Sequence, residues 1–237
     1  MNIPARDRLI VALDLPEAAA ARTLVQRIGA AAGFYKIGME LCMAPGFFEL
    51  LEWLRGQGKQ VFVDLKFFDI PETVGRAVRA LSERGAQFCT VHGNQAIMQA
   101  AAQAKTHGLK VLAVTALTSL DRGDLDDLGF QCDVEALVLS RARRALQAGC
   151  DGVVSSGLEV AKLRAEAPRE LIVVTPGIRP VDNRAESDQK RVMTPSRALQ
   201  AGADYLVVGR PIRDAADPCA AAEAIQAEIA SAVRSEE

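Results

Sequence analysis

Histidine is scarce in this sequence, and its cysteines are few and scattered. Only His92 and His107 occur among 237 residues, so a metal centre built from histidine ligands is not expected. The five cysteines are an odd number and contain no Cys-x-x-Cys pair, which argues against a zinc site and a disulfide framework. We interpret them as reduced thiols of a cytoplasmic protein. Catalytic chemistry must therefore come mainly from Asp, Lys and Arg.

Long apolar runs and an excess of either charge are also missing. No segment reaches the roughly 18 uninterrupted apolar residues of a membrane span, and the N-terminal region lacks the cleavage site of a signal peptide, so we expect neither. The 28 basic and 30 acidic side chains give a net charge of −2. This balance argues against a general binder of nucleic acids or membrane surfaces. Any phosphate group must therefore be held by local cations.

Short apolar or β-branched runs alternate with longer alanine-rich segments of helical period along the whole chain. Such alternation implies parallel strands, because each helix serves as a crossover. Eight units in a chain of this length favour a closed (β/α)₈ TIM barrel over an open sheet. Without a linker or a change in composition, we expect residues 1–237 to form a single α/β domain. The expected strands are Leu9–Leu13, Phe34–Gly38, Val61–Lys66, Gln87–His92, Val111–Leu117, Gly152–Ser155, Leu171–Thr175 and Tyr205–Gly209.

The longest irregular segment, residues 177–192, follows the seventh expected strand. A polar loop of this length in a compact barrel is usually a working part of the protein or a disordered tip. It lies at the end of the barrel where active sites are built.

The ends of the expected strands carry many charged side chains, and this is the end at which barrel enzymes place their active sites. In the third strand, side chains alternate between the two faces, so Phe62, Asp64 and Lys66 share the interior of the barrel. An inward Asp–Lys pair is either a structural ion pair that plugs the barrel or part of an active site. Taken alone, Lys36 could be solvated and Asp14 could form a turn. The candidates are Asp14, Lys36, Asp64, Lys66, Thr118, Arg179 and Arg210.

The motif D-L-K-x-x-D-I-P at residues 64–71 resembles the signature of the orotidine 5′-phosphate decarboxylase family. D-x-K-x-x-D alone is shared with sister enzymes, but further blocks of the family follow in order along the whole chain. Two positions depart from the pattern, since Phe68 stands where many relatives have His and Glu72 where Asn is frequent. The other matching blocks are Val11–Asp14, Tyr35–Leu41, Leu117–Ser119, Thr175–Pro180, Asp188–Arg191 and Val207–Ile212.

The resemblance implies a carboxy-lyase that converts orotidine 5′-monophosphate to UMP and CO₂ in pyrimidine biosynthesis, with no cofactor and no metal. In this family the lysine that matches Lys66 donates the proton to C6 of the pyrimidine. Asp64, Lys36 and Asp69 would complete an alternating Lys–Asp–Lys–Asp array. All four positions of the array carry the required residue in this sequence.

Asp69 lies past the end of the third expected strand and off its two-residue period. From spacing alone it is either a local cap for the helix that begins at Pro71 or a residue that points toward a neighbouring subunit. The resemblance implies the second alternative. It predicts a homodimer in which Asp69, Ile70 and Thr73 contribute to the active site of the other subunit.

Arg179 and Arg210 follow the seventh and eighth strands, where barrels of this kind commonly bind phosphate. Gly209 would let the backbone N–H approach the phosphate closely. Arg179 taken alone could be a solvated loop residue. By the resemblance, the segment 177–192 would close as a lid over the phosphate-binding site, and its residue Gln189 would contact the phosphate and the pyrimidine. Thr118 would contact the pyrimidine edge, and Asp14 and Lys36 would contact the ribose hydroxyls.

Three alternatives to this function are considered. A sister barrel enzyme would act on a keto-sugar phosphate through Mg²⁺, but it needs a metal-binding Glu near the end of the second strand, where Lys36 would repel the cation. Epimerases of the ribulose-phosphate type need histidine ligands, which two histidines cannot supply. A non-catalytic phosphate-binding barrel would keep Arg179 and Arg210 without the ionic array.

Overall fold

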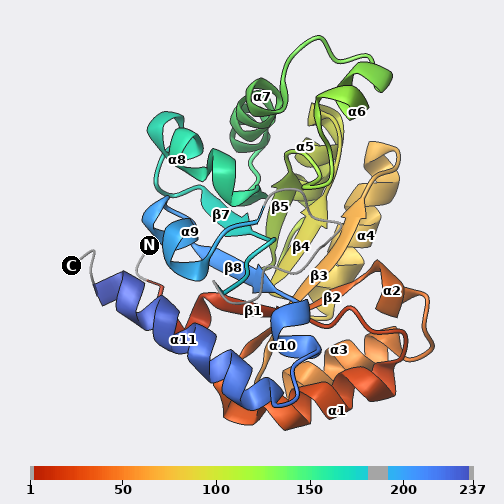
Figure 1. Cartoon of the computed structure of the whole chain (residues 1–237). Coiled ribbons are helices and arrows are strands. Elements are labelled where there is room, and N and C mark those ends of the chain that lie inside the picture. The colour runs from red at the N-terminus through yellow and green to blue at the C-terminus, as the bar shows by residue number, and fades with distance from the viewer. Residues whose placement is uncertain (1–2, 181–191, 235–237) are drawn as a thin grey trace.

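The protein forms the closed (β/α)₈ barrel that the sequence predicts (Figure 1). The computed structural model describes residues 3–180 and 192–234. Neighbouring strands are parallel and pair in sequence order, and β8 returns to pair with β1, so the sheet has no free edge. The strands are β1 (Leu9–Ala12), β2 (Phe34–Gly38), β3 (Gln60–Phe67), β4 (Phe88–Val91), β5 (Lys110–Val114), β6 (Gly152–Val154), β7 (Ile172–Thr175) and β8 (Tyr205–Val208).

Helices surround the strands and connect each one to the next (Figure 1). Within the described residues, none of them is both long and apolar enough to cross a membrane. Short 3₁₀ turns occupy Ala5–Asp7 and Gly29–Ala31. The helices are α1 (Ala18–Ile28), α2 (Met39–Cys42), α3 (Phe47–Gly56), α4 (Pro71–Glu83), α5 (Gln95–Ala104), α6 (Arg122–Asp127), α7 (Val134–Gln147), α8 (Gly157–Glu166), α9 (Pro195–Gln200), α10 (Arg210–Arg213) and α11 (Pro218–Arg234).

Apolar stripes attach the helices to the outer face of the barrel. On α4, Val74, Val78 and Leu81 recur at helical spacing and are at most 4% exposed. Burying side chains of this size stabilises the fold by about 1.5–3 kcal/mol each. The helix begins at Pro71, whose missing N–H costs nothing in the first turn.

Aromatic side chains fill the half of the barrel where the strands begin. Phe34, Phe88 and Tyr205 each start a strand, and their rings meet edge to edge or edge to face with centroids 5.1–6.0 Å apart. Phe62, which lies on β3, packs against Phe88 with the two ring centroids 5.9 Å apart. This apolar plug fills the interior of the barrel where the strands begin, and the cavity lined by the charged residues lies where the strands end.

The expected strand bounds agree with the structure to within one residue, except at one strand end that concerns the site. β5 ends at Val114 and not at Leu117. The backbone N–H and the hydroxyl of Thr115 still donate to the carbonyl oxygen of Val154 on β6. The carbonyl oxygen of Thr115 accepts from Arg141 instead of from a neighbouring strand, so the ladder ends here. Leu117 and Thr118 therefore lie in a loop over the barrel mouth, even though their sequence reads as an apolar run.

Candidate active site

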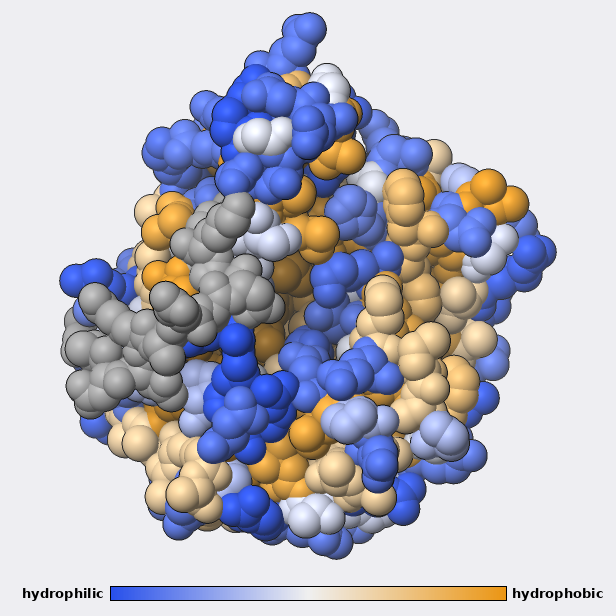
Figure 2. Space-filling view, turned by 45° about the vertical axis from the view of Figure 1, so that its right-hand side comes forward, coloured by the Kyte–Doolittle hydropathy of each residue, from blue (hydrophilic) through white to orange (hydrophobic). Residues whose placement is uncertain are grey.

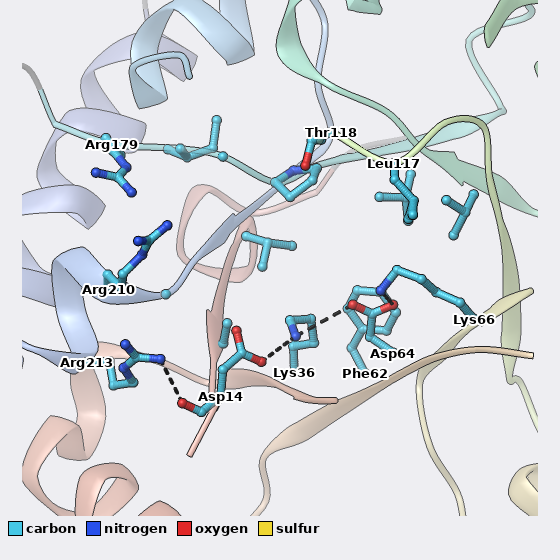
Figure 3. Close-up of a pocket in the computed structure, with 18 of the residues that line it drawn as sticks. Asp14, Lys36, Phe62, Asp64, Lys66, Leu117, Thr118, Arg179, Arg210 and Arg213 are labelled. Carbon is cyan, nitrogen blue, oxygen red and sulfur yellow. Dashed lines mark hydrogen bonds and ion pairs between the residues drawn. The ribbon is translucent and has the colours of Figure 1, made fainter. Parts of the chain in front are cut away.

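A cavity of about 480 Å³ opens at the ends of the strands. The surface in Figure 2 is hollowed near its centre, and hydrophilic side chains lie to the right of the hollow and below it. Most of the predicted site residues line this one cavity, although they come from six different strand ends or following loops (Figure 3). They are Asp14, Lys36, Asp64, Lys66, Thr118, Arg179, Gly209 and Arg210.

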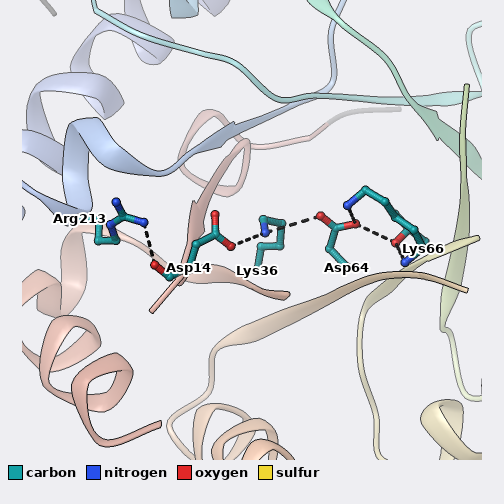
Figure 4. Close-up of polar contacts among 6 residues, drawn as sticks. Asp14, Lys36, Asp64, Lys66 and Arg213 are labelled. Atoms are coloured by element: carbon teal, nitrogen blue, oxygen red, sulfur yellow. Dashed lines mark hydrogen bonds and ion pairs between the residues drawn. The ribbon is translucent and has the colours of Figure 1, made fainter. Parts of the chain in front are cut away.

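Charged side chains of alternating sign form a row across the floor of the cavity (Figure 4). Lys36 Nζ lies 2.8 Å from Asp14 Oδ1 and 3.6 Å from Asp64 Oδ2. Lys66 Nζ lies 3.0 Å from Asp64 Oδ1. The structure therefore brings the predicted Lys36–Asp64–Lys66 part of the array together in one chain, with Asp14 at its far end.

Lys36 is the most enclosed cation of this row, with 9% of its surface exposed. Burial by itself lowers the pKa of a lysine because it disfavours the charged form. Here the carboxylates of Asp64 and Asp14 outweigh burial, and the pKa of Lys36 is raised. Lys36 is thus a permanent cation beneath any ligand in the cavity.

Asp64 lies between the two lysines. Burial alone would raise its pKa, but the charges of Lys36 and Lys66 and hydrogen bonds from Lys66 and Thr90 lower it. Asp64 is therefore ionised at neutral pH. Its charge keeps both ammonium groups in place before any substrate arrives.

The lowered pKa of Asp64 predicts how stability depends on pH. Above about pH 3.9, the ordinary pKa of aspartate, the carboxylate is ionised in the folded and unfolded chain, and its contribution to stability is complete. As the pH falls below that value, the unfolded chain takes up the proton first, so the contribution is lost toward the folded pKa. Relative to Asp64→Asn, the free energy of unfolding of the wild type should fall by up to about 1.4 kcal/mol per pH unit.

Urea unfolding of wild type and Asp64→Asn between pH 7 and pH 3 measures this difference. Between pH 6 and pH 7 the difference should stay constant, which provides an internal control. A difference that stays flat or grows in favour of the wild type toward pH 3 would contradict the ionic state assigned to Asp64.

The side chain of Lys66 points into the cavity because of an irregularity in β3, and not because of the regular alternation of side chains along a strand. The pairing of β3 with β4 changes register between Val63 and Phe67, so the strand bulges at this point. Lys66 has a φ of 49°, in the left-handed region that residues other than glycine seldom adopt. The predicted interior position of Lys66 is confirmed, but the bulge rather than the pleat directs its side chain.

Arginines gather at the other end of the cavity from Lys66 (Figure 3). Arg210 is the first residue of α10, directly after β8, and Gly209 caps this helix. Arg179 follows β7 and is 6% exposed, so it is not a solvated loop residue. Its segment is held by backbone hydrogen bonds to Met193 across the base of the loop. This end of the cavity suits a phosphate group, which arginine forks bind well.

Asp69, Ile70 and Thr73 do not line the cavity of their own chain. The Asp69 carboxylate is exposed and accepts a hydrogen bond from the backbone N–H of Ile70 at 2.6 Å. The residue that caps α4 is Ile70, whose side chain offers no hydrogen bond, so a helix-capping role for Asp69 is not seen. Gln189 lies outside the described residues.

Sequence reasoning missed several residues of the site. Arg213 lines the cavity, and its guanidinium donates to the backbone oxygen of Asp14 at 2.7 Å. A Cβ at Gly38 would lie 3.1 Å from Lys36 Nζ, so glycine leaves room for that ammonium group. Thr90 binds Asp64 from β4. Arg213 follows Arg210 on one short helix, a signal that could have indicated it. Gly38 lies within the matching block Tyr35–Leu41, but the sequence did not indicate its role beside Lys36.

The described residues contain no cluster of three or more His, Cys, Asp or Glu side chains placed to bind a metal ion. Asp14 and Asp64, the two carboxylates of the row, are separated by the ammonium group of Lys36. A divalent cation between them would meet this positive charge directly. The donor set therefore fits an anionic organic ligand and not a metal ion.

Comparison with known proteins places this geometry in a family. Residues 7–225 match the model of the "Orotidine 5'-phosphate decarboxylase / HUMPS family". A protein from Methylococcus capsulatus named orotidine 5′-phosphate decarboxylase is 67% identical over 96% of this chain and 93% of its own length, and one of that name from Rhodopseudomonas palustris is 54% identical over 98% of both. The crystal structure of orotidine 5′-phosphate decarboxylase from Lactobacillus acidophilus superposes with a TM-score of 0.82 at 36% identity, covering 94% of this chain and 99% of that one. The chain belongs to the orotidine 5′-phosphate decarboxylase / HUMPS family.

Proposed function

We propose that this protein is a carboxy-lyase that converts orotidine 5′-monophosphate to UMP and CO₂ for pyrimidine biosynthesis. The observation that carries the proposal is the Lys36–Asp64–Lys66 row at one end of a cavity whose other end holds Arg179 and Arg210. A nucleotide bound with its phosphate at the arginines would place its pyrimidine over the lysines. The identity to relatives of that name supports the same reaction.

The reaction needs a fixed positive charge beside C6. When the bond between C6 and the carboxylate breaks, its electron pair stays on an sp² carbon that the ring delocalises poorly. An ammonium group about 4 Å away stabilises this charge by on the order of 4 kcal/mol at an effective dielectric constant near 20. Lys66 supplies the charge and then donates its proton to C6, and CO₂ leaves. Asp64 holds Lys66 in position for both steps.

Binding of the rest of the nucleotide would use the residues around the cavity. Arg179 and Arg210 bind the phosphate, and the segment 177–192, with Gln189, covers it. The energy of phosphate binding then helps to assemble the site around the pyrimidine. Thr118 contacts the pyrimidine edge, while Asp14 and Lys36 meet the ribose hydroxyls.

The complete array requires a second subunit. Asp69, Ile70 and Thr73 lie outside the cavity of their own chain, which leaves them available to a neighbouring one. The surface around them is apolar and exposed, since Phe68 is 68% and Ile70 65% exposed. Exposed large apolar side chains that lie together commonly mark an interface. A homodimer that shares its active sites accounts for both observations.

The Mg²⁺-dependent sister enzymes are the main alternative, because they share the D-x-K-x-x-D motif of Asp64, Lys66 and Asp69. Lys36 argues against that chemistry, since it is a buried cation where a metal ion would have to bind. A phosphate-binding barrel without activity would not need the ionic row. The intact row therefore favours decarboxylation over both alternatives. The cytoplasmic location stays a prediction.

The proposal is tested by following the absorbance of orotidine 5′-monophosphate in the presence of EDTA. Rapid loss of absorbance with formation of UMP and CO₂ is the expected result. No turnover by the folded wild-type protein would remove the proposal. Turnover that stops with EDTA and returns with Mg²⁺ would favour the metal-dependent alternative.

A further inference from the structure

Thr90 connects the two residues at the centre of the ionic row, although it does not line the cavity itself. It lies on β4 and is fully buried. Its hydroxyl accepts a hydrogen bond from the backbone N–H of Lys66 at 2.9 Å and donates one to Asp64 Oδ1 at 2.8 Å. A hydroxyl has one proton, so donating to the carboxylate leaves its lone pair for the Lys66 N–H.

The first of these hydrogen bonds stabilises an unusual backbone conformation. Lys66 has a positive φ inside the β3 bulge, where the register against β4 shifts. Strained residues of this kind persist only when the surrounding structure holds them. The Thr90 hydroxyl occupies the place of a ladder acceptor for the Lys66 N–H, so it fixes the backbone from which the ammonium group projects.

The second hydrogen bond fixes the rotation of the Asp64 carboxylate. Asp64 Oδ1 accepts from both Thr90 Oγ1 and Lys66 Nζ, while Oδ2 faces Lys36 at 3.6 Å. A carboxylate held in this orientation presents one oxygen to each lysine. The Thr90 hydroxyl thus fixes both the backbone conformation of Lys66 and the orientation of the Asp64 carboxylate that binds the Lys66 ammonium group.

We infer that Thr90 is a positioning residue for Lys66 and Asp64. The inference rests on the proposed function, because it assigns Thr90 a role in that reaction. Removing the hydroxyl should move the ammonium group away from C6 without changing the contacts that bind the nucleotide. Displacements of about 1 Å can lower rates by on the order of 10²-fold.

The test compares Thr90→Val, which has the same shape without a hydroxyl, with Thr90→Ser, which keeps the hydroxyl. We expect Thr90→Val to lower kcat by about 10- to 100-fold with little change in KM, and Thr90→Ser to retain most of the activity. Thr90→Ala provides a second variant without the hydroxyl. The matched control is Thr175→Val on β7, because the Thr175 hydroxyl is buried without a hydrogen-bond partner among the described residues.

Amide hydrogen exchange of Lys66, followed by NMR, provides a readout independent of activity. Exchange should speed up in Thr90→Val and Thr90→Ala and stay slow in Thr90→Ser and Thr175→Val, because only the first two lose the acceptor. Unchanged kcat in both hydroxyl-free variants, or a serine variant as slow as valine, would overturn the inference while the proposed function stands. An inactive wild type would remove the proposed function, and the exchange rates would still decide whether Thr90 holds Lys66.

Discussion

Replacing Lys66 with alanine is expected to lower kcat for orotidine 5′-monophosphate by about 10⁴-fold or more. Two effects are lost together, because the ammonium group both stabilises the carbanion and protonates it. Losing a positioned proton donor costs about 10²–10⁴-fold, and losing a preorganised electrostatic contact costs about 10²–10³-fold. The assay is the absorbance decrease of the substrate, with EDTA present so that trace metal cannot contribute.

The matched control is Lys162→Ala, which removes a lysine on α8 that is exposed and paired with Glu135. Its kcat should equal that of the wild type. UMP binding, measured by calorimetry, should survive in Lys66→Ala, because Arg179 and Arg210 remain to hold the phosphate. A Lys66→Ala variant that keeps more than about a tenth of the wild-type kcat would contradict both roles given to Lys66.

The fold was predictable because a barrel repeats one local signal. Each strand is a short apolar run and each helix a longer periodic one, and eight repeats leave little choice of topology. Sequence reasoning was wrong where the apolar signal continued past a strand end. Leu117 belongs to the same apolar run as Val114, but the ladder ends at Thr115, whose carbonyl oxygen accepts from Arg141 on a distant helix and not from a strand.

The site was predictable to the extent that it depends on strand ends. Asp14, Lys36, Asp64 and Lys66 were found because charged residues at inward positions are rare and the family motif names them. The bulge at Lys66 could not be predicted, since it results from how β3 pairs with β4 and from the Thr90 hydroxyl. Contacts between side chains far apart in sequence leave no periodic trace in either segment.

The position of Asp69 leads to the second large prediction, which concerns mixed dimers. Lys66→Ala and Asp69→Ala should each be nearly inactive as pure proteins. When the two chains are mixed and allowed to exchange subunits, half of the dimers will contain one chain of each kind. In such a dimer both lesions fall in one site and the other site is whole, so activity should return to about one quarter of the wild-type value.

A second mixture provides the control, because Lys66 and Asp64 bind each other within one chain. Mixing Lys66→Ala with Asp64→Ala leaves a lesion in every site, so no activity should return even though the dimers form equally well. Differently tagged chains, separated by affinity and measured by mass spectrometry, show whether exchange has occurred. Recovery in both mixtures would mean that residues other than Asp69 also act across the interface. Recovery in neither mixture would mean that Asp69 does not act in the site of its neighbour. Recovery in the first mixture alone requires that the cavity of one chain is completed by the carboxylate of another.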